Sequence, residues 1–210
     1  MPTFTKAELS QALQELGELC VQAGKVIDIA VYGGSCLILV SNFRFGSEDV
    51  DAVAALEDQP LVDELSGKIA LRHGWPPDWL NDGVRTYLSP AVESHDAHEL
   101  FATYPNESNP GLRVYVPIPE YMLAMKLMAL RIAPTGSKDF EDIINLLQIV
   151  GIASKATIVE FAARFYPEAR ISAKLRLALD DLWNSYQAKV VSAVHESPEY
   201  LGRSRRPPEG

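Results

Sequence analysis

Two aspartates separated by one residue carry the strongest chemical signal in the chain. Asp49 and Asp51 stand at the start of a short apolar run, Val50 to Ala54, which is typical of a strand. Because residues i and i+2 of a strand point to the same face, we expect the two carboxylates to converge. Two convergent oxygens suit Mg²⁺ or Mn²⁺, which take their other ligands from water and phosphates. The pair therefore predicts a metal site, and a solvated strand edge is the alternative.

A glycine-rich turn precedes the aspartates and could hold phosphate. The segment Val26 to Tyr32 predicts a buried strand, which Gly33, Gly34 and Ser35 interrupt before a short apolar helix. Glycines let a ligand approach the backbone closely, and the start of a helix offers free amides to a phosphate. Ser35 adds a hydroxyl, and Arg44 adds a cation between the two motifs. The alternatives are an ordinary turn and a plain surface arginine.

A single lysine on an apolar helix is the next candidate. Lys126 lies in the predicted helix Glu120 to Ile132, which is otherwise almost entirely apolar. Its ammonium must either extend to water or contact a buried partner. Asp139 and Asp142, at i and i+3 on the following predicted helix, are near one another and could each pair with it. In the functional interpretation, the ammonium faces the carboxylate and phosphate site.

Taken in order, these motifs resemble the signature of the DNA polymerase β-like nucleotidyltransferase superfamily: a hydrophobic strand, Gly-Gly/Ser-Ser, and then Asp-hydrophobic-Asp-hydrophobic. The second block resembles the abortive-infection type IV toxins of toxin–antitoxin pairs and their minimal bacterial relatives. In those families a helix with one lysine is followed by Arg or Lys and Asp-x-x-Asp. The residues that match this pattern are Lys126, Lys138, Asp139 and Asp142, and the resemblance covers about residues 26 to 150.

The resemblance implies an enzyme that transfers a nucleoside monophosphate from a nucleoside triphosphate to an acceptor hydroxyl. It implies that Asp49 and Asp51 hold the metal, and that Lys126, Asp139 and Asp142 belong to the catalytic site. The acceptor could be tRNA or another RNA, a protein side chain, or a small molecule such as an aminoglycoside. A cognate antitoxin is the protein partner that the toxin-like branch implies.

The superfamily commonly has a third catalytic carboxylate on a later strand. The candidate strand here, residues 112–118, carries Arg113 and Tyr115 but no acid. Either two metal-binding carboxylates suffice, or another acid such as Asp96 substitutes. This departure keeps a second hypothesis open, in which the chain is a degenerate nucleotidyltransferase-like protein that binds nucleotide or a partner without turnover.

Composition excludes several classes of protein. The chain has 210 residues, of which 47% are hydrophobic and 22% charged, as in a folded globular protein. Its formal charge of −9 argues against a long nucleic-acid footprint, because an acidic surface repels the phosphate backbone. No apolar run approaches the ~18 residues of a transmembrane helix. The absence of a signal-peptide pattern and the two isolated cysteines, Cys20 and Cys36, favour a cytoplasmic protein without a membrane partner.

The element pattern predicts an α/β fold with a small mixed β-sheet and a C-terminal helical bundle. We expect an α/β core over residues 1–118, a helical region over 119–195 and a flexible tail over 196–210. Two tryptophans in the core region, Trp75 and Trp79, stand close to aspartates. They could stack on a nucleobase, and the alternative is that they fill the hydrophobic core.

Overall fold

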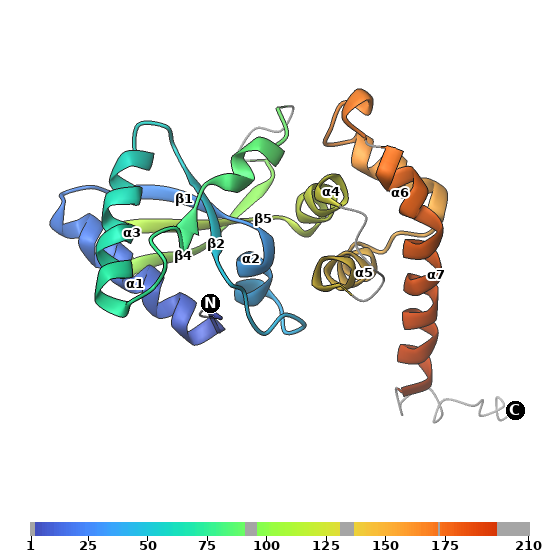
Figure 1. Ribbon diagram of the computed structural model, residues 1–210, viewed down its shortest axis with the longest axis horizontal. Coiled ribbons are helices and arrows are strands. Elements are labelled where there is room, and N and C mark those ends of the chain that lie inside the picture. The colour runs from blue at the N-terminus through green and yellow to red at the C-terminus, as the bar shows by residue number, and fades with distance from the viewer. Residues whose placement is uncertain (1–2, 91–95, 131–136, 172, 197–210) are drawn as a thin grey trace, which may run out of the picture.

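The computed structural model describes residues 3–90, 96–130, 137–171 and 173–196. These residues form a mixed α/β structure, which confirms the predicted fold class (Figure 1). In chain order the elements are α1 (Lys6–Gln22), β1 (Ile27–Val31), α2 (Gly33–Val40), β2 (Val50–Ala54), α3 (Gln59–His73), β3 (Leu80–Asn81), the 3₁₀-helix η1 (Gly83–Tyr87), β4 (His98–Asn106), β5 (Asn109–Pro117), α4 (Pro119–Ala129), α5 (Lys138–Val150), α6 (Lys155–Ala163), the 3₁₀-helix η2 (Glu168–Arg170) and α7 (Ala173–Glu196).

A five-stranded sheet forms the centre of the first half, in the order β3-β2-β1-β5-β4. The middle strand, β1, is antiparallel to β2 and parallel to β5, so the sheet is mixed as predicted. At the edges, β3 runs parallel to β2 and β4 runs antiparallel to β5. The antiparallel pairing brings the end of β1 beside the start of β2, where the glycine and aspartate motifs lie.

Helix α1 packs on the sheet because one of its faces is apolar. A capping box fixes its start: the Thr5 hydroxyl accepts from the Glu8 amide, and the Glu8 carboxylate accepts from the Thr5 amide. Apolar side chains recurring from Leu9 to Cys20 are buried. The contact with β5 is close, since a Cβ on Gly111 would overlap with the Gly17 carbonyl oxygen. The sheet therefore has a rigid support on this side.

The second half of the chain is helical. Figure 1 shows α1 and α3 together at one end of the molecule, and α4 to α7 as a group at the other. Strand β5 ends at Pro117 and α4 begins at Pro119, so the chain passes directly from the sheet into the helices. One hydrophobic cluster runs through both halves. The predicted division at residue 118 stays a prediction, and nearly all of the predicted tail, from residue 197, lies outside the described residues.

Both cysteines are buried and free. Burial raises the pKa of the Cys20 thiol to about 11. This favours the unreactive thiol form. Among the described residues, no single helix is long and apolar enough to cross a membrane by itself. Helices α5 and α6 together have sufficient length and apolar composition, but the chain bends by 90° between them.

Candidate functional site

The pairing of β1 with β2 positions Asp51 beside the start of α2. The Tyr32 amide, just beyond β1, donates to the Asp51 carbonyl oxygen at 2.8 Å. The next residue, Gly33, begins α2 with a φ of 61°. A Cβ at Gly33 would overlap with Oδ2 of Asp51. Glycine is required here both by the left-handed backbone and by the closeness of this carboxylate.

A cavity of about 640 Å³ opens at this point. Its volume is typical of sites that bind small molecules, which occupy roughly 300–1,000 Å³. The charged residues that line it, together with Gly33, come from the start of α2, the residues around the start of β2, α4 and α5, and we group them as the charged wall. The residues of this charged wall are Gly33, Glu48, Asp49, Asp51, Lys126 and Asp139. Segments far apart in the sequence thus contribute to one site.

Removal from water raises the pKa of the Asp51 carboxyl to about 6. Burial is the main cause, and the negative charge of Asp49 is the second. Lys126 acts in the opposite direction, and Asp139 raises the pKa slightly further. The ionised form of Asp51 is therefore disfavoured in the protein alone, and a cation bound in the cavity would favour it.

The donor set fits a hard divalent cation. Asp49 and Asp51 both line the cavity, as the strand alternation predicts, and both offer carboxylate oxygens. Within the part of the chain that the structure describes, no group of three or more His, Cys, Asp and Glu side chains is placed to hold a metal. Two carboxylates match Mg²⁺, which is commonly bound by one or two carboxylates, waters and substrate phosphates. The two carboxylates therefore suit a metal ion that takes its remaining ligands from water and from a phosphorylated substrate.

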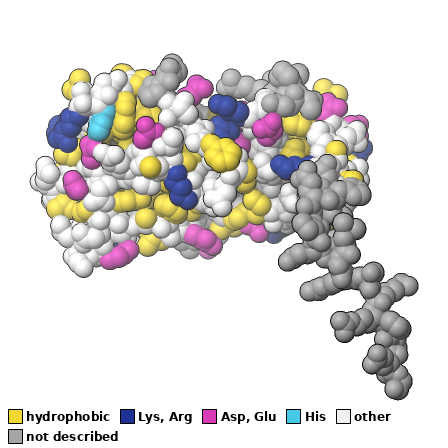
Figure 2. Space-filling view, turned by 90° about the horizontal axis from the view of Figure 1, so that it is seen from below, with side chains coloured by type: hydrophobic (Ala, Val, Ile, Leu, Met, Phe, Trp, Pro, Cys, Tyr) yellow, Lys and Arg dark blue, Asp and Glu magenta, His cyan; other side chains and the backbone are white. Residues whose placement is uncertain are grey.

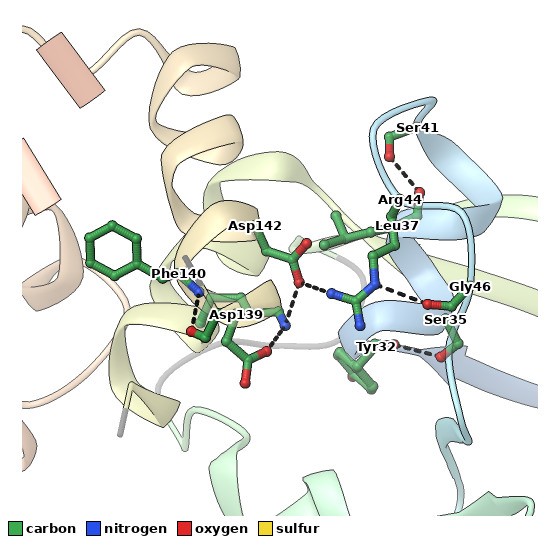
Figure 3. Close-up of polar contacts among 11 residues, drawn as sticks. Tyr32, Ser35, Leu37, Ser41, Arg44, Gly46, Asp139, Phe140 and Asp142 are labelled. Atoms are coloured by element: carbon green, nitrogen blue, oxygen red, sulfur yellow. Dashed lines mark hydrogen bonds and ion pairs between the residues drawn. The ribbon is translucent and has the colours of Figure 1, made fainter. Parts of the chain in front are cut away.

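An ion cluster centred on the buried Asp142 lies beside the cavity and links α5 to the α2–β2 loop (Figure 3). Asp142 of α5 is 3% exposed, and its Oδ2 accepts from Arg44 Nη1 at 2.7 Å and from Lys126 Nζ at 2.9 Å. The Lys126 ammonium also donates to Asp139 Oδ1 at 2.7 Å. The Lys126 side chain is 10% exposed. Its ammonium therefore does not extend into bulk water but is held beside the cavity by two carboxylates. We call Arg44, Lys126, Asp139 and Asp142 the Asp142 ion cluster.

The structure brings five of the predicted site residues to the cavity: Gly33, Asp49, Asp51, Lys126 and Asp139. They combine paired carboxylates, a cation and the first turn of a helix in one concave site. Asp142 lies immediately behind them and contacts the cavity through Lys126.

Three of the predicted phosphate ligands, Gly34, Ser35 and Arg44, are not among the residues that line the cavity. Helix α2 begins at Gly33, so Gly34 and Ser35 belong to its first turn and are buried. The Ser35 hydroxyl donates to the Tyr32 carbonyl oxygen at 2.8 Å. Arg44 is drawn to Asp142 because that carboxylate is buried and needs a cation, and its Nε donates to the Gly46 carbonyl oxygen. The side chains of Ser35 and Arg44 therefore stabilise the fold through contacts within the protein. Of the glycine-rich turn, Gly33 at the start of α2 is the residue that lines the cavity.

Some cavity residues carry no strong sequence signal. Glu48 directly precedes the aspartate motif and could have been found by extending it. Tyr87 of η1 lies in a segment without periodicity. Trp79 is 1% exposed and its Nε1 donates to the Ser66 carbonyl oxygen, so this tryptophan fills the core rather than facing a nucleobase. Asp96, considered as a third acid, is not among the residues that line the cavity.

Comparison with protein-family models gave no match, and neither the curated proteins nor the solved structures gave one. The resemblance to the nucleotidyltransferase superfamily therefore stays a prediction based on the motifs.

Replacing Gly33 with alanine is expected to destabilise the protein and to displace Asp51. The left-handed backbone costs a side chain about 1–2 kcal/mol, and the new methyl group overlaps with the carboxylate. Gly24→Ala is the matched control, because Gly24 has a φ of 67° but no atom within 4 Å of the added Cβ. Both variants should unfold at a lower temperature, Gly33→Ala by the larger amount, whereas Mg²⁺ affinity, measured by calorimetry, should fall only for Gly33→Ala. Equal Mg²⁺ affinity in the two variants would contradict the assignment.

Proposed function

We propose that the chain is a Mg²⁺-dependent nucleotidyltransferase. One observation carries the proposal: Asp49 and Asp51 line the same cavity as Gly33 and Lys126. Carboxylates for a metal, a cation and a helix start are the groups that binding and transfer of a nucleotide need. The order of the motifs along the chain supports the same reaction class.

In the proposed reaction, an acceptor oxygen forms a bond to the α-phosphorus and loses its proton. The bond from that phosphorus to the bridging oxygen breaks, and pyrophosphate leaves. Bound Mg²⁺ would supply charge that stabilises the attacking and leaving oxygens. Asp49 and Asp51 would hold it, and the α2 amide end at Gly33 would orient the phosphates. Lys126, fixed by the Asp142 ion cluster, would neutralise negative charge that develops on the phosphates.

The acceptor we favour presents a short phosphate footprint, such as the end of a tRNA. On the face shown in Figure 2, the described Lys and Arg side chains are scattered among hydrophobic and acidic ones rather than gathered in one basic field. The net charge of −9 points in the same direction. A toxin role with a cognate antitoxin belongs to this proposal as one biological setting.

A second candidate function is nucleotide or partner binding without turnover. It is favoured by the pairing of both cluster cations, since Lys126 and Arg44 already contact carboxylates. In this case the cavity would bind a metal-complexed nucleotide and leave it intact.

The proposal is tested by incubating the protein with each nucleoside triphosphate labelled on the α-phosphate, Mg²⁺ and either total tRNA or a cell lysate. We expect label to appear on a macromolecule and pyrophosphate to be released, and EDTA to prevent both. Binding of the nucleotide without label transfer would favour the second candidate. Failure to bind any nucleotide in the presence of Mg²⁺ would contradict both nucleotidyl transfer and nucleotide binding, and would leave partner binding as the function.

Lys126→Met is expected to lower the rate of transfer by about 10²–10³-fold, because a cation aimed at transition-state charge contributes roughly 3–4 kcal/mol. The loss of stability should stay below about 2 kcal/mol, since Asp142 keeps its bond to Arg44 and is not left as an unpaired buried charge. Single-turnover kinetics and urea unfolding measure the two effects. Full activity in a folded Lys126→Met protein would remove Lys126 from the catalytic assignment.

A further inference from the structure

The cavity is also lined by apolar residues that the proposed reaction does not use, and we group them as the apolar wall. This apolar wall comes from η1 and α4, which lie against one another. Its residues are Val84, Tyr87, Met122, Met125, Ala129 and Leu130. The charged wall and the apolar wall enclose the same 640 Å³ space. A ligand that fills this space must therefore carry a charged part and an apolar part.

Tyr87 is the aromatic side chain on this wall, and its backbone is held from both sides. The Tyr166 hydroxyl donates to the Tyr87 carbonyl oxygen at 2.7 Å. Arg170 Nη2 donates to the carbonyl oxygen of the preceding residue, Thr86, at 3.2 Å. On the other side, Arg85 Nη2 donates to the Ala54 carbonyl oxygen at 3.1 Å, which ties η1 to the end of β2.

These contacts leave the Tyr87 side chain available. It is 37% exposed, whereas its carbonyl oxygen accepts from Tyr166 and the η1 helix that carries it is tied to the sheet through Arg85. A ring on a fixed backbone loses little conformational entropy when a ligand binds against it. The geometry is that of a pre-formed aromatic platform at the side of the cavity.

The apolar wall suits a flat heteroaromatic ring. Met122 and Met125 are buried at 2% and 4% exposure, and methionine sulfur makes favourable contacts with aromatic rings. Among the described residues of this wall, the Tyr87 hydroxyl is the one polar side-chain group. Such a surface binds a base through stacking, which tolerates different bases, rather than through hydrogen bonds to its edge.

We infer that Tyr87 and the apolar wall form the subsite for the nucleobase of the nucleoside triphosphate, and that this subsite discriminates weakly among bases. The inference rests on the proposed function, because the triphosphate is assigned to the charged wall. The ribose joins the two parts of the nucleotide, so one molecule occupies both walls of the cavity. The C-terminal helical region then contributes to substrate binding through Tyr166 and Arg170, which hold Tyr87 in place.

The test measures equilibrium binding without turnover. The α,β-methylene analogues of ATP, GTP, CTP and UTP are titrated calorimetrically in the presence of Mg²⁺, and tripolyphosphate serves as a probe that lacks a base. The variants are Tyr87→Leu, which removes the ring but keeps an apolar side chain, and Tyr87→Phe, which keeps the ring. Phe45→Ala is the matched control, because Phe45 is an aromatic residue that is 83% exposed and does not line the cavity.

We expect Tyr87→Leu to weaken binding of all four analogues by about 5- to 150-fold, the range that base–aromatic stacking contributes. Its affinity for tripolyphosphate should equal that of the wild type, and Tyr87→Phe and Phe45→Ala should bind the analogues normally. The four wild-type affinities should lie within about tenfold of one another, as expected for stacking.

Three results would overturn the subsite and leave the proposed function standing: unchanged analogue binding by Tyr87→Leu, an equal loss for analogues and tripolyphosphate, or a strong preference for one base. Failure of the wild type to bind both the analogues and tripolyphosphate would overturn the proposed function as well.

Discussion

Replacing Asp51 with asparagine is expected to abolish nucleotidyl transfer and to make the metal-free protein more stable. The rate should fall by about 10³-fold or more, because a bound metal supplies several kcal/mol of transition-state stabilisation. The gain in stability comes from the partly buried carboxylate. Its pKa is raised from 3.8 to about 6, so the folded state binds the proton more tightly than the unfolded chain does.

The stability gain should depend on pH. A raised pKa makes a favourable contribution that is complete below about pH 4 and is lost as the pH rises through about 6. At neutral pH the ionised carboxylate therefore destabilises the metal-free fold by about 1–3 kcal/mol, and asparagine removes that cost. In a chain of this size each kcal/mol shifts the melting temperature by about 2–4 °C. Thermal unfolding in EDTA at pH 4 and pH 7 measures the difference.

Asp28→Asn provides the control for Asp51→Asn. Asp28 is an exposed carboxylate on the same sheet, where its Oδ1 accepts from Arg113 Nε at 2.6 Å. Exposed ion pairs contribute about 0–1 kcal/mol, so this variant should be neutral or slightly less stable and should keep its activity. A lower melting temperature for Asp51→Asn in EDTA, or transfer at the wild-type rate, would contradict the assignment of Asp51 to the metal.

The sequence predicts those parts of the site that depend on local spacing. Asp49 and Asp51 follow the two-residue period of a strand, and Asp139 and Asp142 follow the helical i, i+3 spacing. Both patterns place side chains on one face without knowledge of the tertiary structure. Because the i, i+3 spacing brings Asp139 and Asp142 together, the sequence also predicts, as one alternative, that both pair with Lys126, and the structure shows both bonds.

The remaining contacts depend on tertiary packing. Arg44 and Asp142 are separated by 98 positions, and no local pattern relates them. Ser35 was predicted at a turn before a helix, but α2 includes it from Gly33 onward. Successive side chains of an α-helix are rotated by about 100° around its axis, so the residue at which the helix begins decides whether Ser35 faces a ligand or the core. Strand β3 has only two residues, Leu80 and Asn81, too few for a periodic signal.

Asp142→Asn is expected to destabilise the protein strongly. One oxygen of this buried carboxylate accepts from both Arg44 and Lys126, at 2.7 and 2.9 Å. Removing its charge leaves two cations close together where water cannot solvate them well. Loss of one partner from a buried ion pair costs about 3–5 kcal/mol, and we expect a loss of this size in urea unfolding.

Asp139→Asn is the matched control for Asp142→Asn, since both aspartates lie on α5 and bind the same ammonium. The bond to Asp139 is the shorter of the two, 2.7 Å against 2.9 Å, but the Asp139 side chain is 69% exposed and that of Asp142 is 3% exposed. Water already solvates Asp139, so its loss should cost at most about 1 kcal/mol. Burial rather than distance therefore determines which of the two aspartates contributes more to stability, and Asp142 is the one that accepts from Arg44 of the α2–β2 loop.

A double variant distinguishes the loss of stability caused by broken ion pairs from that caused by poorer packing. Asp142→Asn leaves two cations, Arg44 and Lys126, without the charge of Asp142. The double variant Arg44→Met/Asp142→Asn also removes the first of these cations. The double variant should therefore lose less stability than the sum of the single variants, with a coupling of about 0.5–3 kcal/mol. Additive losses, or equal small losses for Asp142→Asn and Asp139→Asn, would show that the cluster does not connect the two halves. Under the proposed function Asp142 also holds Lys126 at the cavity, so variants of Asp142 should lose stability and transfer together.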